Sequence, residues 1–403
     1  MTYDIDAVRA GYPALAEGFA HFDGAAGTLV ADRVAAAVAA TLRTAVANRT
    51  HLFEPGRRAI RLVEAARGAV ADLVGGDARG VVFGPSTTAL TYTVARTLAR
   101  DWGPGDEVVV SQLDHDANVR PWIQAATAAG ATVRWARVDL ASGTLPAAQY
   151  ADLVNARTRL VAVTAASNVA GSRPDVATIS GYAHAAGALC YVDGVHATPH
   201  VPTDVTALGA DFYVTSAYKW SGPHIAACVA DPVTWERMRP DKLVPSSDAV
   251  PDRFEYGTPS FELLAGVDAA VTQLAEEGGA PASDSRRDRI VASMTAIAAY
   301  EAALFDRLLT GLAGVPGIWL CPAVGERCPT VSFRLGDQPP AQTAEALGRE
   351  RICVFAGDYY AVEYFDALGL RDSGGAVRAG VYHYTTAAEV DRLIDAVHRL
   401  AVG

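Results

Sequence analysis

The chain has 403 residues, with 34 Lys and Arg against 45 Asp and Glu, which gives a formal net charge of −11 at pH 7. Half of its residues are hydrophobic and a fifth are charged, which is typical of a folded globular protein and excludes a disordered chain. The length predicts two or three domains, and the acidic balance argues against a partner such as nucleic acid or an anionic membrane.

From about residue 80, short apolar runs alternate with Ala-rich runs. We expect strands at 81–83, 107–112, 131–138, 159–167, 188–193 and 211–216, and helices at 87–100, 117–129 and 179–186. Nearly continuous apolar strands between helices predict an α/β fold with a mostly parallel sheet that is flanked by helices. Ligands of such sheets bind at the carboxyl ends of the strands, so a site is expected there.

The composition changes in the last third of the chain. A polar loop (239–253) and a connection rich in Gly, Ser and charged residues (275–289) precede expected helices at 290–312, 341–350 and 387–400 and a strand at 330–335. We therefore predict a large domain over residues 21–275 and a smaller α+β domain over 276–403, with residues 1–20 packing against the small domain.

The five cysteines are expected to be reduced thiols, because their number is odd and no C-x-x-C pair occurs, which favours a cytoplasmic protein. The closest pair, Cys321 and Cys328, lacks the companions of a zinc site, so no metal is expected. Gly and Pro interrupt the longest uncharged stretch (308–325), so we expect no membrane helix there. Acidic residues near the N-terminus also predict that no export signal is present.

Polar residues gather just past the ends of the predicted strands. They are Thr87, Thr88, His115, Asn168, Asp193, His196, Ser216 and Lys219. Because the carboxyl ends of parallel strands meet at one edge, we expect these side chains to lie together. Each of them matches one need of a site for pyridoxal 5'-phosphate.

Lys219 and Asp193 are the central pair of this set. A partly desolvated lysine at a sheet edge can lose its proton and form a Schiff base, although a lone lysine is more often a surface residue. A carboxylate that ends an apolar strand is costly to bury without a cation, which the pyridinium nitrogen would supply; a turn or helix cap is the alternative. Their separation of 26 residues fits one helix and one strand.

Two further features are less specific. The GPSTT run (84–88) follows a strand and opens a helix, where hydroxyl and N–H groups suit a phosphate, although simple N-capping explains one hydroxyl. No P-loop or G-x-G-x-x-G motif occurs, which disfavours a nucleotide site and a Rossmann dehydrogenase. His115 could stack on the pyridine ring, bind a metal with Asp114 and Asp116, or belong to a polar turn.

Eight stretches across nearly the whole chain carry a family resemblance. They are HFDGAAGT, VVFGPSTT, PGDEVVVSQLDHDANVRPW, ASNVAGSRPD, ALCYVDGVHATPH, DFYVTSAYKWSGP, RFEYGTPS and VRAGVYHYTTAAEVDRL. In these stretches and their order, the chain resembles aminotransferase class V enzymes of the cysteine desulfurase and selenocysteine lyase branch, with isopenicillin N epimerase as a more distant relation. The resemblance implies an aspartate-aminotransferase-like fold, pyridoxal phosphate as cofactor, and a homodimer with cofactor sites at the interface.

The resemblance also implies residue roles. Lys219 would form the Schiff base, His115 would stack on the ring, Asp193 would face the ring nitrogen, and Asn168 and His196 would lie near the phenolic oxygen. The phosphate would be held by Thr87, Thr88, Ser216, Tyr218 and, from the second subunit, Thr258. The substrate would meet Arg378 at its carboxylate, with Asn48 and Arg49 at the entrance and Tyr360 in a loop of the small domain.

Three departures from the family pattern affect the expected reaction. Tyr218 stands where desulfurases usually carry histidine, and His196 stands where glutamine is usual. The loop that carries the desulfurases' nucleophilic cysteine reads VFAGDYYAVEY here, with Tyr360 in the expected place. Cys353 lies seven residues earlier in an apolar run and is expected to be a buried hydrophobic residue. The chain thus resembles a desulfurase-like subgroup that lacks the catalytic cysteine.

The leading hypothesis is an enzyme that acts on an α-amino acid as a C–S lyase, eliminating the β-substituent of cysteine or an S-substituted cysteine. Lys219 would remove the Cα proton, and Tyr359 or Tyr360 could protonate the leaving group. The alternatives are an aminotransferase, an amino-acid epimerase, desulfurase-like sulfur transfer, or a non-catalytic partner protein that retains the cofactor.

Overall fold

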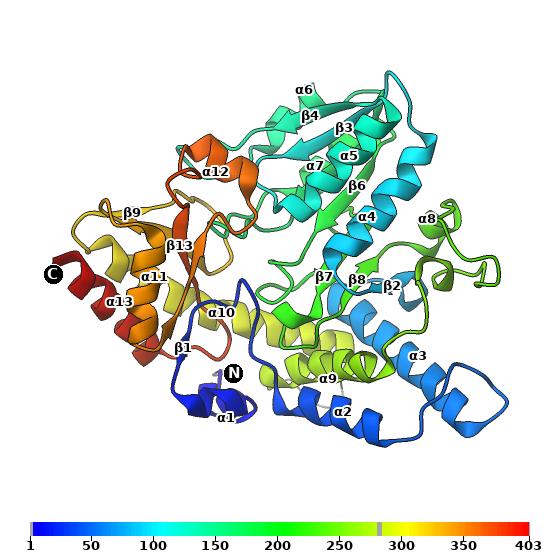
Figure 1. The fold of residues 1–403 in the computed structure, drawn as a ribbon, viewed down its shortest axis with the longest axis horizontal. Coiled ribbons are helices and arrows are strands. Elements are labelled where there is room, and N and C mark those ends of the chain that lie inside the picture. The colour runs from blue at the N-terminus through cyan, green and yellow to red at the C-terminus, as the bar shows by residue number, and fades with distance from the viewer. Residues whose placement is uncertain (1–2, 280–283, 403) are drawn as a thin grey trace.

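The computed structural model describes residues 3–279 and 284–402. A seven-stranded sheet of order β2-β8-β7-β6-β5-β3-β4 lies at the centre of the larger part of the molecule (Figure 1). Its strands are β2 (Val81–Gly84), β3 (Glu107–Ser111), β4 (Thr132–Ala136), β5 (Thr158–Thr164), β6 (Leu189–Asp193), β7 (Phe212–Ser216) and β8 (Ala226–Val229). Strands β3 to β7 pair in parallel, whereas β8 runs antiparallel to β2 and β7. The mostly parallel sheet is thus confirmed.

Alternation along the central strands builds two cores, one on each face of this sheet. Val161 and Val163 of β5 belong to one buried cluster, and Leu160 and Ala162 belong to the other. Successive strand residues point to opposite faces, so a fully apolar strand feeds both clusters. Burial of each Val or Leu side chain contributes about 1.5–3 kcal/mol.

Helices cover both faces of the sheet. The first cluster includes residues of α3 (Glu54–Val74), α7 (Val176–Ala185) and α9 (Phe261–Glu277). The second includes residues of α4 (Thr87–Leu98) and α5 (Arg120–Ala129). Two short helices, α6 (Tyr150–Leu153) and α8 (Pro232–Glu236), lie in the connections. The expectation of a sheet flanked by helices is therefore confirmed.

The C-terminal part of the chain forms a smaller α+β unit. Its antiparallel sheet has the order β12-β13-β10-β9, with β9 (Ile318–Leu320), β10 (Thr330–Leu335), β12 (Phe355–Gly357) and β13 (Ala376–Gly380). Its helices are α10 (Arg286–Ala313), α11 (Pro340–Arg349), α12 (Val362–Leu368) and α13 (Ala387–Val402). A third buried cluster joins α10, α11 and α13 to this sheet, as the predicted smaller domain requires.

The N-terminal segment contacts the C-terminal unit. In this segment lies α1 (Ile5–Ala10), where Arg9 pairs with Glu389 at 3.0 Å, while the Tyr3 hydroxyl donates to the His383 carbonyl at 2.9 Å. The strand β1 (Ala20–His21) pairs in parallel with β11 (Ile352–Cys353), and α2 (Asp32–Arg43) packs against α9. The exact domain boundaries stay a prediction.

Several details differ from the sequence-based expectations. A 3-10 turn (Asp116–Asn118) precedes α5, which begins at Arg120 because Pro121 suits a helix start. The expected connection at 275–289 is shorter, since α9 reaches Glu277 and α10 begins at Arg286, and residues 280–283 lie outside the described part. Cys353, the last residue of the two-residue strand β11, is only partly buried, so its expected burial in the interior was wrong.

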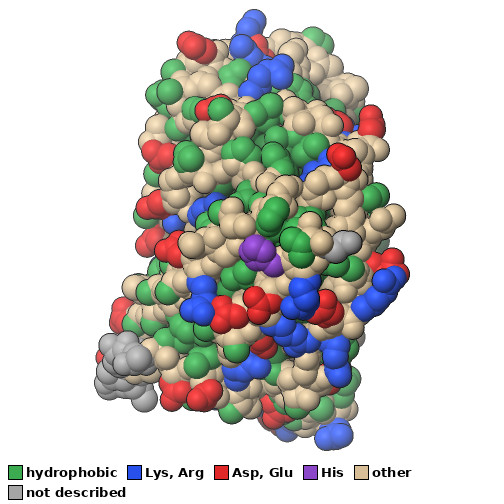
Figure 2. Space-filling model, turned by 90° about the vertical axis from the view of Figure 1, so that its left-hand side faces the viewer, with side chains coloured by type: hydrophobic (Ala, Val, Ile, Leu, Met, Phe, Trp, Pro, Cys, Tyr) green, Lys and Arg blue, Asp and Glu red, His purple; other side chains and the backbone are tan. Residues whose placement is uncertain are grey.

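The surface carries charges of both signs. Figure 2 shows the face that lies at the left of Figure 1, where Lys and Arg side chains alternate with Asp and Glu side chains. Within residues 3–279 and 284–402, the helices are all too short or too polar to cross a membrane.

Candidate active site

The parallel strands end together at one polar edge. Strands β5, β6 and β7 end at Thr164, Asp193 and Ser216, whose side chains line one cavity. The cavity is lined by Ser86, Thr87, Thr88, His115, Ala117, Thr164, Ala166, Asn168, Asp193, Val195, His196, Ser216, Tyr218 and Lys219. The eight residues that the strand-end pattern singled out, and Tyr218, therefore lie together.

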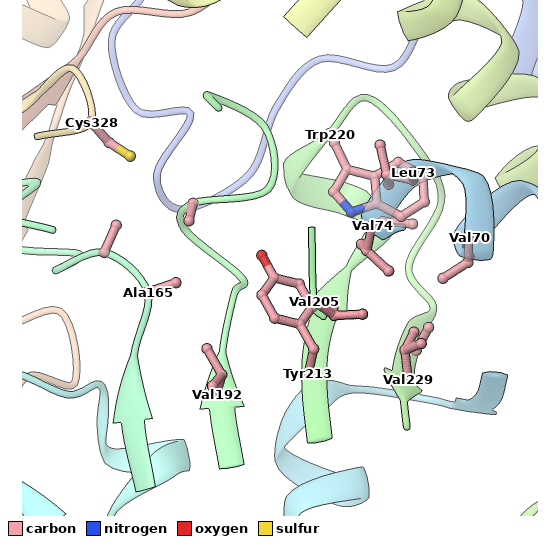
Figure 3. Close-up of a cluster of buried hydrophobic side chains, with 14 of the residues drawn as sticks. Val70, Leu73, Val74, Ala165, Val192, Val205, Tyr213, Trp220, Val229 and Cys328 are labelled. Atoms are coloured by element: carbon pink, nitrogen blue, oxygen red, sulfur yellow. The ribbon is translucent and has the colours of Figure 1, made fainter. Parts of the chain in front are cut away.

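Lys219 is held at this cavity by a well-anchored turn. The next residue, Trp220, is buried in the cluster that contains Leu73 and Val74 of α3, and its indole N–H donates to the Thr215 hydroxyl at 3.0 Å (Figure 3). On the other side, the Thr28 hydroxyl donates to the Tyr218 carbonyl at 2.9 Å. These contacts fix the lysine backbone from both sides.

Burial lowers the pKa of the Lys219 amine to about 8, because an ammonium loses its hydration there. The value already includes a smaller lowering by the Arg378 guanidinium and an opposing increase from the Asp193 carboxylate. At pH 7 roughly a tenth of the amine is then unprotonated, far more than for an exposed lysine. The amine is available as a nucleophile and as a base.

Asp193 presents a buried carboxylate beside the lysine. Its Oδ1 accepts a hydrogen bond from the Val195 N–H at 2.9 Å. Burial raises the pKa of Asp193, while the Val195 N–H and the Lys219 charge lower it. A buried carboxylate is stabilised by a cationic partner, and a protonated ring nitrogen would be such a partner.

The N-terminus of α4 supplies hydroxyl groups to the same cavity. The Ser86 hydroxyl accepts from the Ala89 N–H at 3.1 Å and therefore caps the helix. The Thr87 and Ser216 hydroxyls lie 2.7 Å apart. Because Ser86 does the capping, the Thr87 and Thr88 hydroxyls are not needed as caps, and they could bind an anion at the positive end of the helix dipole. The GPSTT run alone does not show which of its hydroxyl groups caps the helix α4.

His115 is a neutral imidazole at the edge of the cavity. Its Nδ1 accepts from the Ala117 N–H at 3.0 Å, which leaves the proton on Nε2. Burial, together with the charges of Lys219 and Arg378, lowers its pKa to about 3. The ring stacks on Tyr360 with 5.4 Å between centroids. An uncharged, stackable ring suits contact with an aromatic ligand.

The geometry does not support the alternative metal site at His115. Asp114 accepts hydrogen bonds from Ser111 and, at 2.7 Å, from the Asn118 amide. Asp116 pairs with Arg120 at 2.9 Å. Both carboxylates are thus engaged with other partners.

Hydrogen bonds of Asn168 connect the cavity to Arg378 of β13. The Asn168 amide donates to the Tyr359 carbonyl at 2.9 Å, and Arg378 Nη1 donates to the Asn168 carbonyl at 3.0 Å. The Arg378 guanidinium lies over the Tyr359 ring, 4.4 Å from its centroid. The Tyr359 hydroxyl donates to the Ala376 carbonyl and is therefore engaged in a buried hydrogen bond. The supporting role of Tyr359 gave no signal in the sequence.

Several buried polar atoms around the cavity have no hydrogen-bond partner among the described residues. They are Asn168 Oδ1, His196 Nδ1 and Arg378 Nε. A bound group could supply the missing partners, since burial without a partner costs about 1–3 kcal/mol for each atom. A carboxylate for a ring nitrogen, hydroxyls at a helix start for a phosphate, and an amine between them together fit pyridoxal phosphate.

The remaining predicted residues lie outside this cavity in the single chain. Thr258 is exposed and lines a separate cavity of about 670 Å³. Asn48 and Arg49 are exposed, and Arg49 pairs with Asp252 at 2.9 Å. Tyr360 is 69% exposed at the rim, above His115.

Comparison with known proteins finds relatives that match nearly the whole chain. The family model described as aminotransferase class-V matches residues 20–393. An uncharacterized protein of Mycobacterium tuberculosis, MT3887, is 38% identical over 99% of this chain and 100% of its own length. A cysteine desulfurase of Klebsiella pneumoniae (strain ATCC 700721 / MGH 78578) is 31% identical over 99% of both chains.

The fold agrees with these matches. The crystal structure of the cysteine desulfurase CsdA from Escherichia coli superimposes with a TM-score of 0.86 at 27% identity, covering 99% of this chain and 98% of that one. This likeness confirms the expected fold of pyridoxal-phosphate enzymes. The chain belongs to the aminotransferase class-V family, a family of pyridoxal-phosphate-dependent enzymes.

Proposed function

We propose that the protein binds pyridoxal phosphate and acts as a C–S lyase that removes the β-substituent of cysteine or an S-substituted cysteine. The main support is the composition of the cavity around Lys219. Among the described residues, its lining contains no thiol, and Tyr360 stacks on His115 at the rim. Elimination needs a base and an electron sink but no protein thiol, whereas persulfide formation needs the thiol.

The cofactor, when bound, supplies an electron sink for negative charge at Cα. Asp193 would hold the ring nitrogen protonated, and Thr87, Thr88 and Ser216 would bind the phosphate. Arg378 would orient the substrate carboxylate with its unpartnered Nε. Lys219 would take the Cα proton while the Cβ–S bond breaks, and the sulfur would leave with the bonding electron pair.

The products follow from this bond breaking. The sulfur substituent leaves as a thiol after protonation, for which the exposed Tyr360 hydroxyl is the available acid. The remaining enamine takes up water and gives pyruvate and ammonia. Desulfurase-like sulfur transfer is the second candidate, because a relative of 31% identity bears that name. It would require Cys353 of β11, which is outside the lining of the Lys219 cavity.

Product analysis tests the proposal. The protein loaded with pyridoxal phosphate is incubated with cysteine, cystine and S-substituted cysteines, with Lys219→Ala as the inactive control. Pyruvate and ammonia in equal amounts, together with a thiol or sulfide, are expected. Alanine with a protein persulfide would instead establish sulfur transfer, and an inverted amino acid or pyridoxamine phosphate would establish epimerisation or transamination. The absence of any product from all substrates, together with no deuterium exchange at Cα, would favour a non-catalytic role.

The lowered pKa of Lys219 predicts how fast the cofactor-free protein captures pyridoxal phosphate at different pH values. Only the unprotonated amine attacks the aldehyde, so the capture rate should rise with pH and level off above a midpoint of about 8. Stopped-flow absorbance from pH 6 to 11 measures this midpoint. A midpoint near 10.5, the value of an ordinary lysine, would contradict the buried environment.

Arg378→Lys should weaken substrate binding while leaving cofactor binding unchanged. A planar guanidinium binds a carboxylate through two parallel hydrogen bonds, and an ammonium does not. We expect KM to rise about 10-fold to 100-fold, the equivalent of about 1.4–2.8 kcal/mol. Arg334→Lys, at a partly exposed position of neighbouring β10 where Arg334 binds the Ser373 hydroxyl, is the matched control. An unchanged KM would remove Arg378 from the substrate site.

A homodimer completes the proposed site. Thr258 is exposed on a cavity separate from that of Lys219, so a contribution to phosphate binding must come from a second subunit. The expected mass in solution is therefore twice 42.1 kDa. Light scattering after gel filtration measures it, and a monomer with full activity would contradict this part of the proposal.

A further inference from the structure

A short parallel strand pair brings three metal-ligating side chains together from distant parts of the sequence. In the pairing of β1 with β11, His21 lies opposite Cys353. Two backbone hydrogen bonds of 2.9 Å, from Ala20 N to Arg351 O and from Phe22 N to Cys353 O, fix this register. Asp23 follows His21 by two residues, so in an extended chain both side chains point to the same face.

The three ligand atoms are close enough to share one ion. His21, Asp23 and Cys353 each offer an atom, and these atoms lie within 4.8 Å of one another. His21 Nδ1 and Asp23 Oδ1 are 3.5 Å apart. Two ligands at about 2.1 Å from a tetrahedral zinc ion are separated by about 3.4 Å, so this pair has the spacing of one tetrahedron edge.

We propose that His21, Asp23 and Cys353 bind a zinc ion, with the fourth position open to water or to another ligand. Thiolate, imidazole and carboxylate together suit zinc, whereas calcium and magnesium prefer oxygen ligands. All three residues are partly exposed, which gives the ion a path from solvent. The other four cysteines are buried, so Cys353 is the thiol that solvent reaches.

The site would connect metal binding to the segment that supports the lysine turn. Asp23 begins the segment that leads to Thr28, whose hydroxyl binds the Tyr218 carbonyl and accepts from the Ser221 N–H. Gly24 fits closely beneath the Tyr382 ring, where a Cβ would lie 2.2 Å from a ring carbon. An ion at Asp23 would therefore join this tightly packed segment to β11. Zinc binding by these three residues would not depend on the reaction that takes place at Lys219.

Direct zinc binding tests the proposal. The protein, with its cofactor and without a purification tag, is freed of metal and titrated with zinc alone in a calorimeter. One equivalent should bind, and Cys353→Ser and His21→Ala should each weaken binding at least tenfold. His184→Ala is the matched control, because His184 pairs with Asp211 at 2.9 Å outside any three-ligand group among the described residues. Equal binding by wild type and Cys353→Ser, or no binding, would overturn the proposal.

Two readouts identify the ligands independently. Zinc X-ray absorption should show one sulfur neighbour at about 2.3 Å and nitrogen or oxygen neighbours at about 2.0–2.2 Å. Zinc, but not magnesium, should protect Cys353 from alkylation by iodoacetamide, as peptide mass mapping would show. A zinc ion without a sulfur neighbour would contradict the proposal. Cofactor absorbance, recorded in the same samples, shows separately whether pyridoxal phosphate binds.

Discussion

Lys219→Ala should lower the turnover of every amino-acid substrate by about 10³-fold or more, because under the proposed mechanism it removes both the covalent anchor of the cofactor and the base at Cα. Lys219 is 7% exposed, its amine has a lowered pKa of about 8, and the other described residues that line the cavity include no second lysine. Steady-state rates and the absorbance of the bound cofactor measure the effect together.

The chain provides a matched control for this substitution. It contains two lysines, Lys219 and Lys242, and the Lys242 ammonium pairs with Asp248 at 3.1 Å in the polar loop after α8. Lys242→Ala should therefore leave the rate and the cofactor absorbance unchanged. Turnover by Lys219→Ala within tenfold of wild type would show that another group abstracts the proton.

Asp193→Asn should have the second-largest effect, lowering turnover by about 10²-fold to 10⁴-fold while leaving the cofactor-free protein folded. An amide can keep the hydrogen bond from the Val195 N–H, but it cannot hold a ring nitrogen protonated. Loss of one partner of a buried ion pair costs about 3–5 kcal/mol, which corresponds to this range of rates. Initial rates at saturating cofactor measure the loss.

Stability separates this functional effect from misfolding. Burial raises the folded-state pKa of Asp193 above its ordinary value of 3.8, so the folded state favours the protonated acid. The cofactor-free protein therefore loses stability as the pH rises from 3.8 through the raised pKa, and Asn removes this contribution. At pH 7, cofactor-free Asp193→Asn should unfold at the same temperature as wild type or higher. A lower unfolding temperature would indicate a structural role for Asp193.

The sequence predicted the central sheet and most of the polar residues at the carboxyl ends of its strands for a clear physical reason. Strands such as β6 are apolar up to their last residue. Burial in the core therefore does not explain the polar residues at the strand ends, such as Asp193 of β6 and Ser216 of β7. A parallel sheet then brings those ends together without further information. The antiparallel strand β8 was not predicted. It has only four apolar residues, and such a short run does not indicate in which direction the strand runs.

Contacts between distant segments were beyond the reach of pattern analysis. The pairing of His21 with Cys353 joins residues that are 332 positions apart, and each strand has only two residues. The support of Arg378 by Tyr359 depends on a loop in which Tyr359 and Tyr360 both have positive φ angles, of 52° and 59°. Non-glycine residues rarely adopt this region, so their local sequence does not predict it.

All the proposed roles of the cavity residues depend on a covalent bond between pyridoxal phosphate and Lys219. Reduction of the cofactor-loaded protein with borohydride, followed by proteolysis and mass mapping, tests this directly because the chain has two lysines. We expect the added pyridoxyl mass on the peptide that contains Lys219 and an unmodified peptide for Lys242. Modification of Lys242 alone, or a protein that takes up no cofactor, would contradict the account.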